Sequence, residues 1–285
     1  MSDFLTPMTH THFTNIDSTN TALMHAIING KLSHDKHHLY TADHQTSGRG
    51  QHGRCWVSGA GNVFLTLFTP IGQNHFELHQ LSGLLSLAVA FELGDLAIIQ
   101  KINQIRLLNN LSPVGIKWAN DIGFYDESLG VFHKLAGILI EPIFKKISNK
   151  STLVGVVVGV GLNVNTSPTI QDGLYQATCL KMLDTAINIH AKDLYTPMAN
   201  AILQAVHICN RCKEPMYLQY FIDKFNAHHL LNNQNIQIFI QNNMTDVFAQ
   251  GRCIGIGSQG ELLLAHHDDI TPIYAGMAKI IKENQ

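Results

Sequence analysis

One stretch near the middle of the chain limits the possible folds more than any other. Residues 153–160 read LVGVVVGV, an apolar run dominated by valine, which favours a strand over a helix. We interpret it as a buried strand. Its glycines leave room for the close approach of a ligand or another backbone segment, or they only permit tight packing in the core.

Other elements are predicted on both sides of this strand. The signals of short apolar strands occur at residues 38–43, 63–68, 115–118 and 135–140, and those of helices at residues 18–30, 78–96 and 192–229. Pro197 and Pro215 mark starts or breaks in the last helical region. The order is not a strict strand–helix–strand repeat, so we expect an α/β (α+β) fold with a mixed sheet and flanking helices.

The composition changes after residue 231. Residues 232–235 are polar (NNQN), and beyond them short alternating segments are joined by turns. We therefore expect two domains: residues 1–231, and a small all-β domain at residues 232–285 that could close a site but not hold one.

Charge and composition exclude several protein classes. The chain has 285 residues, is 45% hydrophobic and 14% charged, and carries 19 Lys and Arg against 21 Asp and Glu, so a disordered or strongly basic protein is excluded. No targeting signal is recognised in residues 1–14, no apolar run approaches the roughly 20 residues that span a bilayer, and five cysteines argue against a disulfide framework. We expect a cytoplasmic protein that binds neither DNA nor membranes.

The glycine-rich loop at residues 48–53 (GRGQHG) matches the dinucleotide-binding spacing, but β-prone residues follow it instead of a helix, which argues against that site. The glycines could instead turn several backbone N–H groups into one concavity, flanked by Arg49 and Arg54, to bind a phosphate or carboxylate. The alternative is a mobile surface loop with two solvated arginines.

Lys134 directly precedes the predicted strand at residues 135–140, so it either extends to solvent or lies at the mouth of a site. Cys209 and Cys212 form a C-x-x-C pair in a helical region, where packed or half-exposed thiols are expected. Most of the 17 histidines are predicted in turns, in solvated or packing roles.

Five motifs in order resemble the biotin protein ligases (biotin–acetyl-CoA-carboxylase ligases). They are Ser18-Thr19-Asn20, residues 45–50 with Gly53-Arg54 and Trp56, residues 117–121 (KWAND), residues 134–139 (KLAGIL) and residues 159–163. The resemblance implies a class II synthetase-like catalytic domain followed by an SH3-like barrel. It also implies a cytoplasmic ligase that uses ATP and Mg²⁺ to convert biotin to biotinyl-5′-AMP, and that transfers biotin to a lysine of the biotin carboxyl carrier protein of acetyl-CoA carboxylase.

The resemblance also implies roles for individual residues. Catalysis is expected from Lys134, Arg49 and Asp121. The expected biotin-binding residues are Ser18, Thr19, Asn20, Gln45, Arg49, Gly50, Gln51 and Lys134. The expected ATP-binding residues are Arg49, Arg54, Trp56, Lys117, Asn120 and Asn163. No dedicated metal site is expected, because Mg²⁺ would arrive with ATP; Asp121 could help to place it or could accept a proton from the acceptor lysine.

The chain departs from the family pattern in the loop, where Gln51 and His52 replace residues that are usually or often basic, and at Ala119, which replaces a proline. Fewer charges in the loop predict faster leakage of the adenylate. Only 17 residues precede the Ser18 motif, so a ligase without the family's DNA-binding helix-turn-helix domain is expected, and a homodimer is left open as its assembly. The alternatives are a lipoate or octanoate ligase or transferase, and a non-catalytic biotin sensor; the loop and the KWAND motif favour biotin.

Overall fold

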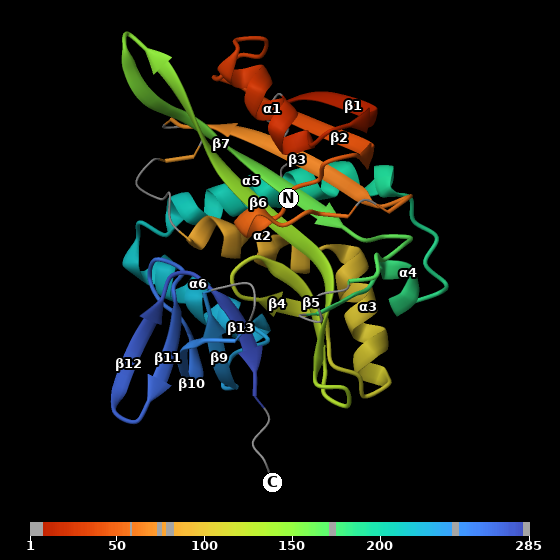
Figure 1. Cartoon of the computed structure of the whole chain (residues 1–285), viewed down its shortest axis with the longest axis vertical. Helices are drawn as coiled ribbons and strands as arrows, with labels where there is room; N and C mark the ends of the chain where they lie inside the picture. Colours follow the sequence, from red (N-terminus) through yellow and green to blue (C-terminus); the bar gives the residue numbers. More distant parts are fainter. Residues whose placement is uncertain are drawn as a thin grey trace.

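The computed structural model describes residues 8–57, 59–72, 76–77, 83–170, 175–240 and 245–281. Its larger sheet has the order β1-β2-β3-β7-β6-β5-β4, with β8 paired to β6 (Figure 1). The strands are β1 (Met8–Ile16), β2 (His37–Gln45), β3 (Val63–Pro70), β4 (Gly115–Lys117), β5 (Asp121–Asp126), β6 (Val131–Ile147), β7 (Lys150–Leu162) and β8 (Gln176–Ala177). Two pairings are parallel, β1 with β2 and β6 with β8, and the others are antiparallel. The predicted mixed sheet is therefore confirmed.

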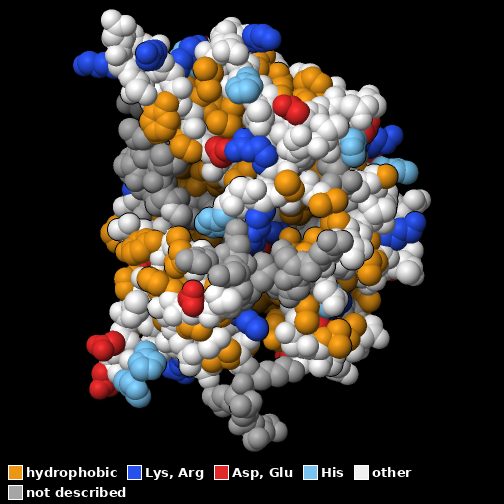
Figure 2. Space-filling model, in the orientation of Figure 1, with side chains coloured by type: hydrophobic (Ala, Val, Ile, Leu, Met, Phe, Trp, Pro, Cys, Tyr) orange, Lys and Arg blue, Asp and Glu red, His pale blue; other side chains and the backbone are white. Residues whose placement is uncertain are grey.

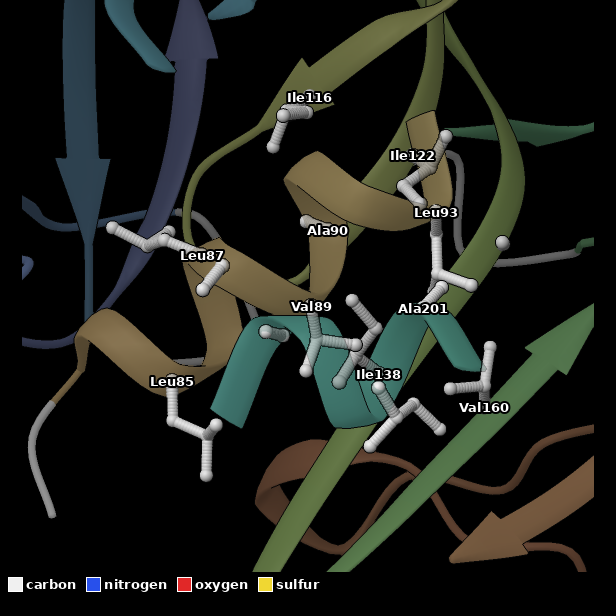
Figure 3. Close-up of a cluster of buried hydrophobic side chains, with 14 of the residues drawn as sticks. Leu85, Leu87, Val89, Ala90, Leu93, Ile116, Ile122, Ile138, Val160 and Ala201 are labelled. Atoms are coloured by element: carbon white, nitrogen blue, oxygen red, sulfur yellow. The ribbon is translucent and has the colours of Figure 1, made fainter. Parts of the chain in front are cut away.

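Helices cover both faces of this sheet. They are α1 (Thr19–Ile28), α2 (Leu84–Gly94), α3 (Ala97–Leu108), α4 (Leu180–Leu183), α5 (Tyr195–Arg211) and α6 (Pro215–His228), with 3-10 turns at Gln51–Gly53 and Ala191–Leu194. Val89 and Leu93 of α2 lie with Ala201 of α5 against Ile138 and Val160 of the sheet (Figure 3).

The strand β7 is buried on both faces. Val156, Val158 and Val160 belong to the large hydrophobic cluster under α2 and α5. Val154 and Val157 belong to a smaller cluster with Leu23 and Ile27 of α1 and Phe68 of β3. The absence of polar alternation in this strand follows from this double burial.

The helix predictions are confirmed in part. Ser18 caps α1, since its hydroxyl accepts the Thr21 N–H at 3.4 Å. The last helical region is broken where Pro215 starts α6. The prediction for residues 78–96 becomes α2, while residues 78–82 lie outside the described residues.

Three features were not foreseen. The strand β1 and the helix α3 were not predicted, and the prediction that most histidines lie in turns is wrong. His10 and His12 stand on β1, and His37 and His38 on β2. The strand β1 is at the edge of the sheet and mostly exposed, so it shows little apolar patterning.

The second sheet is antiparallel, with the order β12-β11-β10-β9-β13, which agrees with a small barrel-like domain at the end of the chain (Figure 1). Its strands are β9 (Asn235–Phe239), β10 (Val247–Ile256), β11 (Leu262–His266), β12 (Asp269–Ile273) and β13 (Met277–Ile280). It is joined to the first sheet by Trp118, whose indole N–H donates to the carbonyl of Gly260 at 2.9 Å. None of the described helices is long and apolar enough to cross a membrane.

Candidate functional site

A polar pocket lies where β2 ends and α1 begins, bounded by β6, β7 and the glycine-rich loop. Ser18, Thr19 and Gln45 line it, and all three are buried. The carboxamide oxygen of Gln45 accepts the Thr19 N–H at 2.8 Å and the Thr19 hydroxyl at 3.1 Å. Because Ser18 caps α1, the first turn of the helix holds the Thr19 and Asn20 side chains at the pocket.

Asn20 is fixed by protein partners on both ends of its carboxamide. Its Nδ2 donates to Glu141 Oε2 at 3.0 Å and to the carbonyl of Leu139 at 3.3 Å, and its Oδ1 accepts from the Thr66 hydroxyl at 2.6 Å. Both Nδ2 hydrogens are therefore used by the protein, and only Oδ1 has remaining capacity for a ligand. Thr66 and Glu141 were not predicted.

The glycines of β6 and β7 make room for side chains of this site. A Cβ at Gly159 would lie 2.8 Å from Asn20 Cγ, and closer still to its Oδ1. A Cβ at Gly161 would lie 2.7 Å from the Trp56 indole nitrogen, and one at Gly137 would lie 2.8 Å from Trp56 Cζ3. The space that the sequence suggested for a ligand or another backbone segment is thus filled by Asn20 and Trp56.

Trp56 brings a hydrogen-bond donor to the pocket. Its indole nitrogen is buried and has no hydrogen-bond partner among the described residues, although indole N–H groups usually find a partner when buried. An unsatisfied donor at this place is available to a ligand.

The glycine-rich loop folds back on itself as a tight hairpin. The amide of Gly50 donates to Arg54 O at 2.8 Å, that of Arg54 to Gln51 O at 3.2 Å, and that of Trp56 to Gly48 O at 2.8 Å. His52 and Gly53 adopt left-handed conformations, with φ of 56° and 73°, to close the turn. These three amides are therefore used within the loop and do not point into a concavity for a ligand.

The loop is attached to the pocket through the Arg49 side chain. Its guanidinium forms an ion pair with Glu141 and donates to the Thr21 hydroxyl at 3.1 Å. The loop is therefore tied to α1 and to β6, which disagrees with a free surface loop bearing two solvated arginines.

Lys134 lies on β6 beside Asp121 of β5. The Lys134 Nζ is 2.7 Å from Asp121 Oδ1, and the two side chains are only 12% and 20% exposed. The ammonium group also lies 5.5 Å from the ring centre of Trp56 and 5.2 Å from that of Tyr175. Lys134 therefore does not extend to solvent.

A wider cavity adjoins the polar pocket, and the two share Gly50, Gln51, Trp56, Asn120, Lys134 and Leu139. Residues 274–278, which run from the β12–β13 connection into β13, also line it, and the Arg54 guanidinium contacts the Met277 sulfur there. On the face drawn in Figure 2, the Lys and Arg side chains are spread over the surface and do not gather in one large patch.

Lys117 contributes a further cation to the wider cavity. Its ammonium group lies 4.8 Å from the ring centre of Phe132. The pKa of Lys117 is lowered from 10.5 to about 8, mainly by burial and to a smaller extent by the charges of Lys134 and Arg54, while the charge of Asp121 opposes the shift.

Two asparagines predicted to contact ATP have structural partners. Asn120 donates to the carbonyl of Ile138 at 2.9 Å. Asn163 is buried; it donates to the carbonyl of Thr178 at 3.0 Å and accepts from Asn62 at 3.2 Å. Asn163 lines a small side cavity with Trp56, but its carboxamide is held within the protein.

The structure brings the other predicted residues to the polar pocket or the wider cavity. The sequence contained weak signals for Thr66 and Glu141, the site residues that were not predicted. Thr66 is a polar residue inside the apolar strand at residues 63–68, and Glu141 follows the apolar segment at residues 135–140.

Among the described residues, no group of three or more His, Cys, Asp or Glu side chains could hold a metal ion. The thiols of Cys209 and Cys212 are both buried, and burial raises the pKa of each, as expected for packed thiols.

Comparison with known proteins points to one family. A model of the biotin/lipoate A/B protein ligase family matches residues 13–163. The bifunctional ligase/repressor BirA of Bacillus subtilis is 28% identical over 250 residues, which are 83% of this chain and 64% of that protein. The biotin–acetyl-CoA-carboxylase ligase of Mycobacterium tuberculosis is 34% identical over 128 residues, 45% of this chain and 39% of that protein. The chain thus spans less than two thirds of the length of these curated relatives.

The fold has a counterpart among solved structures. The biotin protein ligase from Aquifex aeolicus in complex with biotin and ATP superposes with a TM-score of 0.66 at 21% identity, over 96% of this chain and 99% of that one. The enzyme from Leishmania major in complex with biotinyl-5-AMP superposes with a TM-score of 0.54 at 19% identity, over 96% and 99%. These similarities establish the fold, including the second sheet.

Proposed function

Because the chain belongs to the biotin/lipoate A/B protein ligase family, we propose that it is an ATP-dependent biotin protein ligase. In the first step a biotin carboxylate oxygen bonds to the α-phosphorus of ATP and pyrophosphate leaves. In the second, the amine of an acceptor lysine attacks the acyl carbon, AMP leaves and the amine gives up a proton. The acceptor is the biotin carboxyl carrier protein of acetyl-CoA carboxylase, and the reaction is cytoplasmic.

The observation that carries this proposal is the buried polar end of the first pocket. It presents the Gln45 carboxamide, the Thr19 and Ser18 hydroxyls and the unpaired indole N–H of Trp56. The ureido group of biotin has two N–H donors and a carbonyl acceptor that can pair with such groups, whereas the dithiolane ring of lipoate and the octanoyl chain have neither. A ligand without polar groups would leave the buried indole N–H of Trp56 without a partner, so the pocket favours biotin.

The charges in the wider cavity suit the first step. That step brings a carboxylate to a triphosphate, and a site that stabilises it must provide positive charge. Arg54, Lys117 and Lys134 of the wider cavity and Arg49 of the adjoining polar pocket provide it in our proposal. Mg²⁺ bound to the phosphates would supply more, and Asp121 is the carboxylate in this region that could contact it.

Asp121 is engaged by Lys134 in the ligand-free protein. In our proposal the substrate phosphate draws Lys134 away, since the lysine then gains a second anionic partner. Asp121 is then available either to the metal ion or to the proton of the acceptor lysine, an amine that is protonated at neutral pH.

Exchange of labelled pyrophosphate into ATP tests the activity. We expect exchange that requires biotin and is not supported by lipoate or octanoate. Exchange with lipoate alone would assign the chain to another activity of the family. No exchange with any of these acids, in a protein that binds biotin in calorimetry, would identify a biotin sensor without catalysis.

A further inference from the structure

Glu141 connects the glycine-rich loop to the wall of the polar pocket. This residue lies near the middle of β6, seven residues after Lys134. Its Oε1 pairs with the Arg49 guanidinium of the loop, and its Oε2 accepts from Asn20 Nδ2 at 3.0 Å. Each carboxylate oxygen of Glu141 therefore holds a different part of the site.

Burial makes this arrangement more than a surface ion pair. The Glu141 side chain is 19% exposed, whereas Arg49 is 42% exposed. Exposed ion pairs contribute little, but a carboxylate that is mostly buried and hydrogen-bonded on both oxygens fixes its partners in one geometry. Asn20 is held further by Thr66, so the chain of contacts ends in the floor of the pocket.

The guanidinium of Arg49 retains donors for a ligand. Among the described residues, Glu141 and Thr21 each take one of its five N–H groups, which leaves three without a partner in that part of the chain. Because Arg49 also lines the polar pocket, these remaining donors lie where a bound ligand's anionic group can meet them.

We propose that Glu141 is a positioning residue that presents Arg49 to the anionic group of the bound adenylate, and that it thereby controls how long the adenylate is retained. This inference rests on the function proposed above. Simple electrostatics predicts the opposite effect, since a carboxylate near an anion should weaken its binding. Whether neutralising Glu141 speeds or slows the release of the adenylate therefore distinguishes a positioning role from electrostatic competition.

Glu141→Gln is the decisive variant, because it removes the charge that holds Arg49 but keeps an oxygen that can accept from Asn20. We expect biotinyl-adenylate, formed from biotin and ATP and chased with unlabelled ligands, to leave about ten-fold faster than from the parent protein. Slower or unchanged release would overturn the proposal. Glu77→Gln is the matched control, since Glu77 forms a similar, partly buried pair with Lys213 outside the pocket.

A double-mutant cycle tests whether Glu141 acts through Arg49. In an Arg49→Ala background, the additional Glu141→Gln change should alter the release rate less than two-fold, because there is no guanidinium left to position. Additive effects of the two substitutions would contradict the proposed coupling. Thermal unfolding of each variant verifies that the chain remains folded.

A ligand-free measurement keeps this inference separate from the proposed function. Cys55 lies two residues after the loop and forms an antiparallel bridge with Arg49. It is the exposed cysteine, whereas Cys179, Cys209, Cys212 and Cys253 are buried, so a nitroxide label can be directed to Cys55. We expect its paramagnetic resonance spectrum to shift from an immobilised to a mobile line shape in Glu141→Gln and not in Glu77→Gln. An unchanged spectrum would refute the positioning role even in a protein that makes no adenylate, whereas the absence of adenylate with the expected shift would refute only the ligase function.

Discussion

Adding one methyl group at Gly159 should weaken biotin binding through Asn20. In Gly159→Ala the new Cβ would lie 2.8 Å from Asn20 Cγ and 3.0 Å from Nδ2, and closer to Oδ1. Both positions are buried, and Gly159 is paired with Thr66 in the middle of the sheet, so the backbone has little freedom to yield. The Asn20 side chain must move.

The cost follows from what Asn20 would lose. Its carboxamide makes hydrogen bonds to Glu141, to the Leu139 carbonyl and to Thr66, each worth about 1 kcal/mol net. Losing two or three of them, with some overpacking, should lower the free energy of unfolding by about 2–4 kcal/mol. Since Asn20 forms the pocket wall, we expect the biotin dissociation constant to rise at least about ten-fold, which corresponds to roughly 1.4 kcal/mol.

Gly155→Ala is the matched control on the same strand. Its Cβ would lie 2.5 Å from Phe68 Cζ and 2.6 Å from the Thr69 carbonyl, away from the pocket. Urea unfolding should show a loss of stability in both variants, whereas calorimetric titration with biotin should show weaker binding only in Gly159→Ala. Equal weakening in both would mean that the strand responds as a whole, and normal binding by a folded Gly159→Ala would refute the role of Asn20.

Three further predictions concern charged or polar side chains of the site. Lys134→Ala should slow adenylate formation in single-turnover experiments by about 10²–10³-fold, if Lys134 stabilises developing charge; an unchanged rate would leave it only the ion pair with Asp121. Because the pKa of Lys117 is lowered to about 8, kcat/KM for ATP should fall above about pH 8, and Lys117→Met should remove that fall from the pH profile. The stability effect has the opposite sign: the unfolded chain binds more protons between about pH 8 and 10.5, so the contribution of Lys117 to stability should rise with pH in that range, as urea titrations of the parent and Lys117→Met can measure. Gln51→Arg should slow adenylate release in a chase experiment, and no change would contradict the leakage hypothesis.

The elements that the sequence predicted well are those that packing dictates. The apolar run in β7 predicted a buried strand because both of its faces meet hydrophobic clusters. The strand β1 gave no such signal, because it pairs on one edge only and is mostly exposed. The helix α3 did carry a signal, since Ile99 and Ile102 are three residues apart and both buried, and it was missed.

The sequence could predict which residues belong to the candidate site, but not which of them contact one another. The motifs identified most of the residues around the two cavities, yet they said nothing about where the loop amides or the Asn163 carboxamide find partners. These contacts join residues far apart in the chain, such as Asn62 with Asn163, so no local pattern reports them. For the same reason the sequence could not show what occupies the space beside the glycines of β7, because the side chains that fill it come from other parts of the chain.

The chain is nearly neutral overall, and within the site, too, positive charges lie beside negative ones. Of its four cations, two are paired with carboxylates, Arg49 with Glu141 and Lys134 with Asp121. Arg54 contacts the Met277 sulfur, and Lys117 is held with a lowered pKa. An anionic substrate therefore exchanges partners with groups that are already ordered, so it does not have to bear the full cost of organising free side chains. A site built in this way should bind the adenylate by geometry more than by total charge, which is why neutralising Glu141 and displacing Asn20 are expected to weaken it.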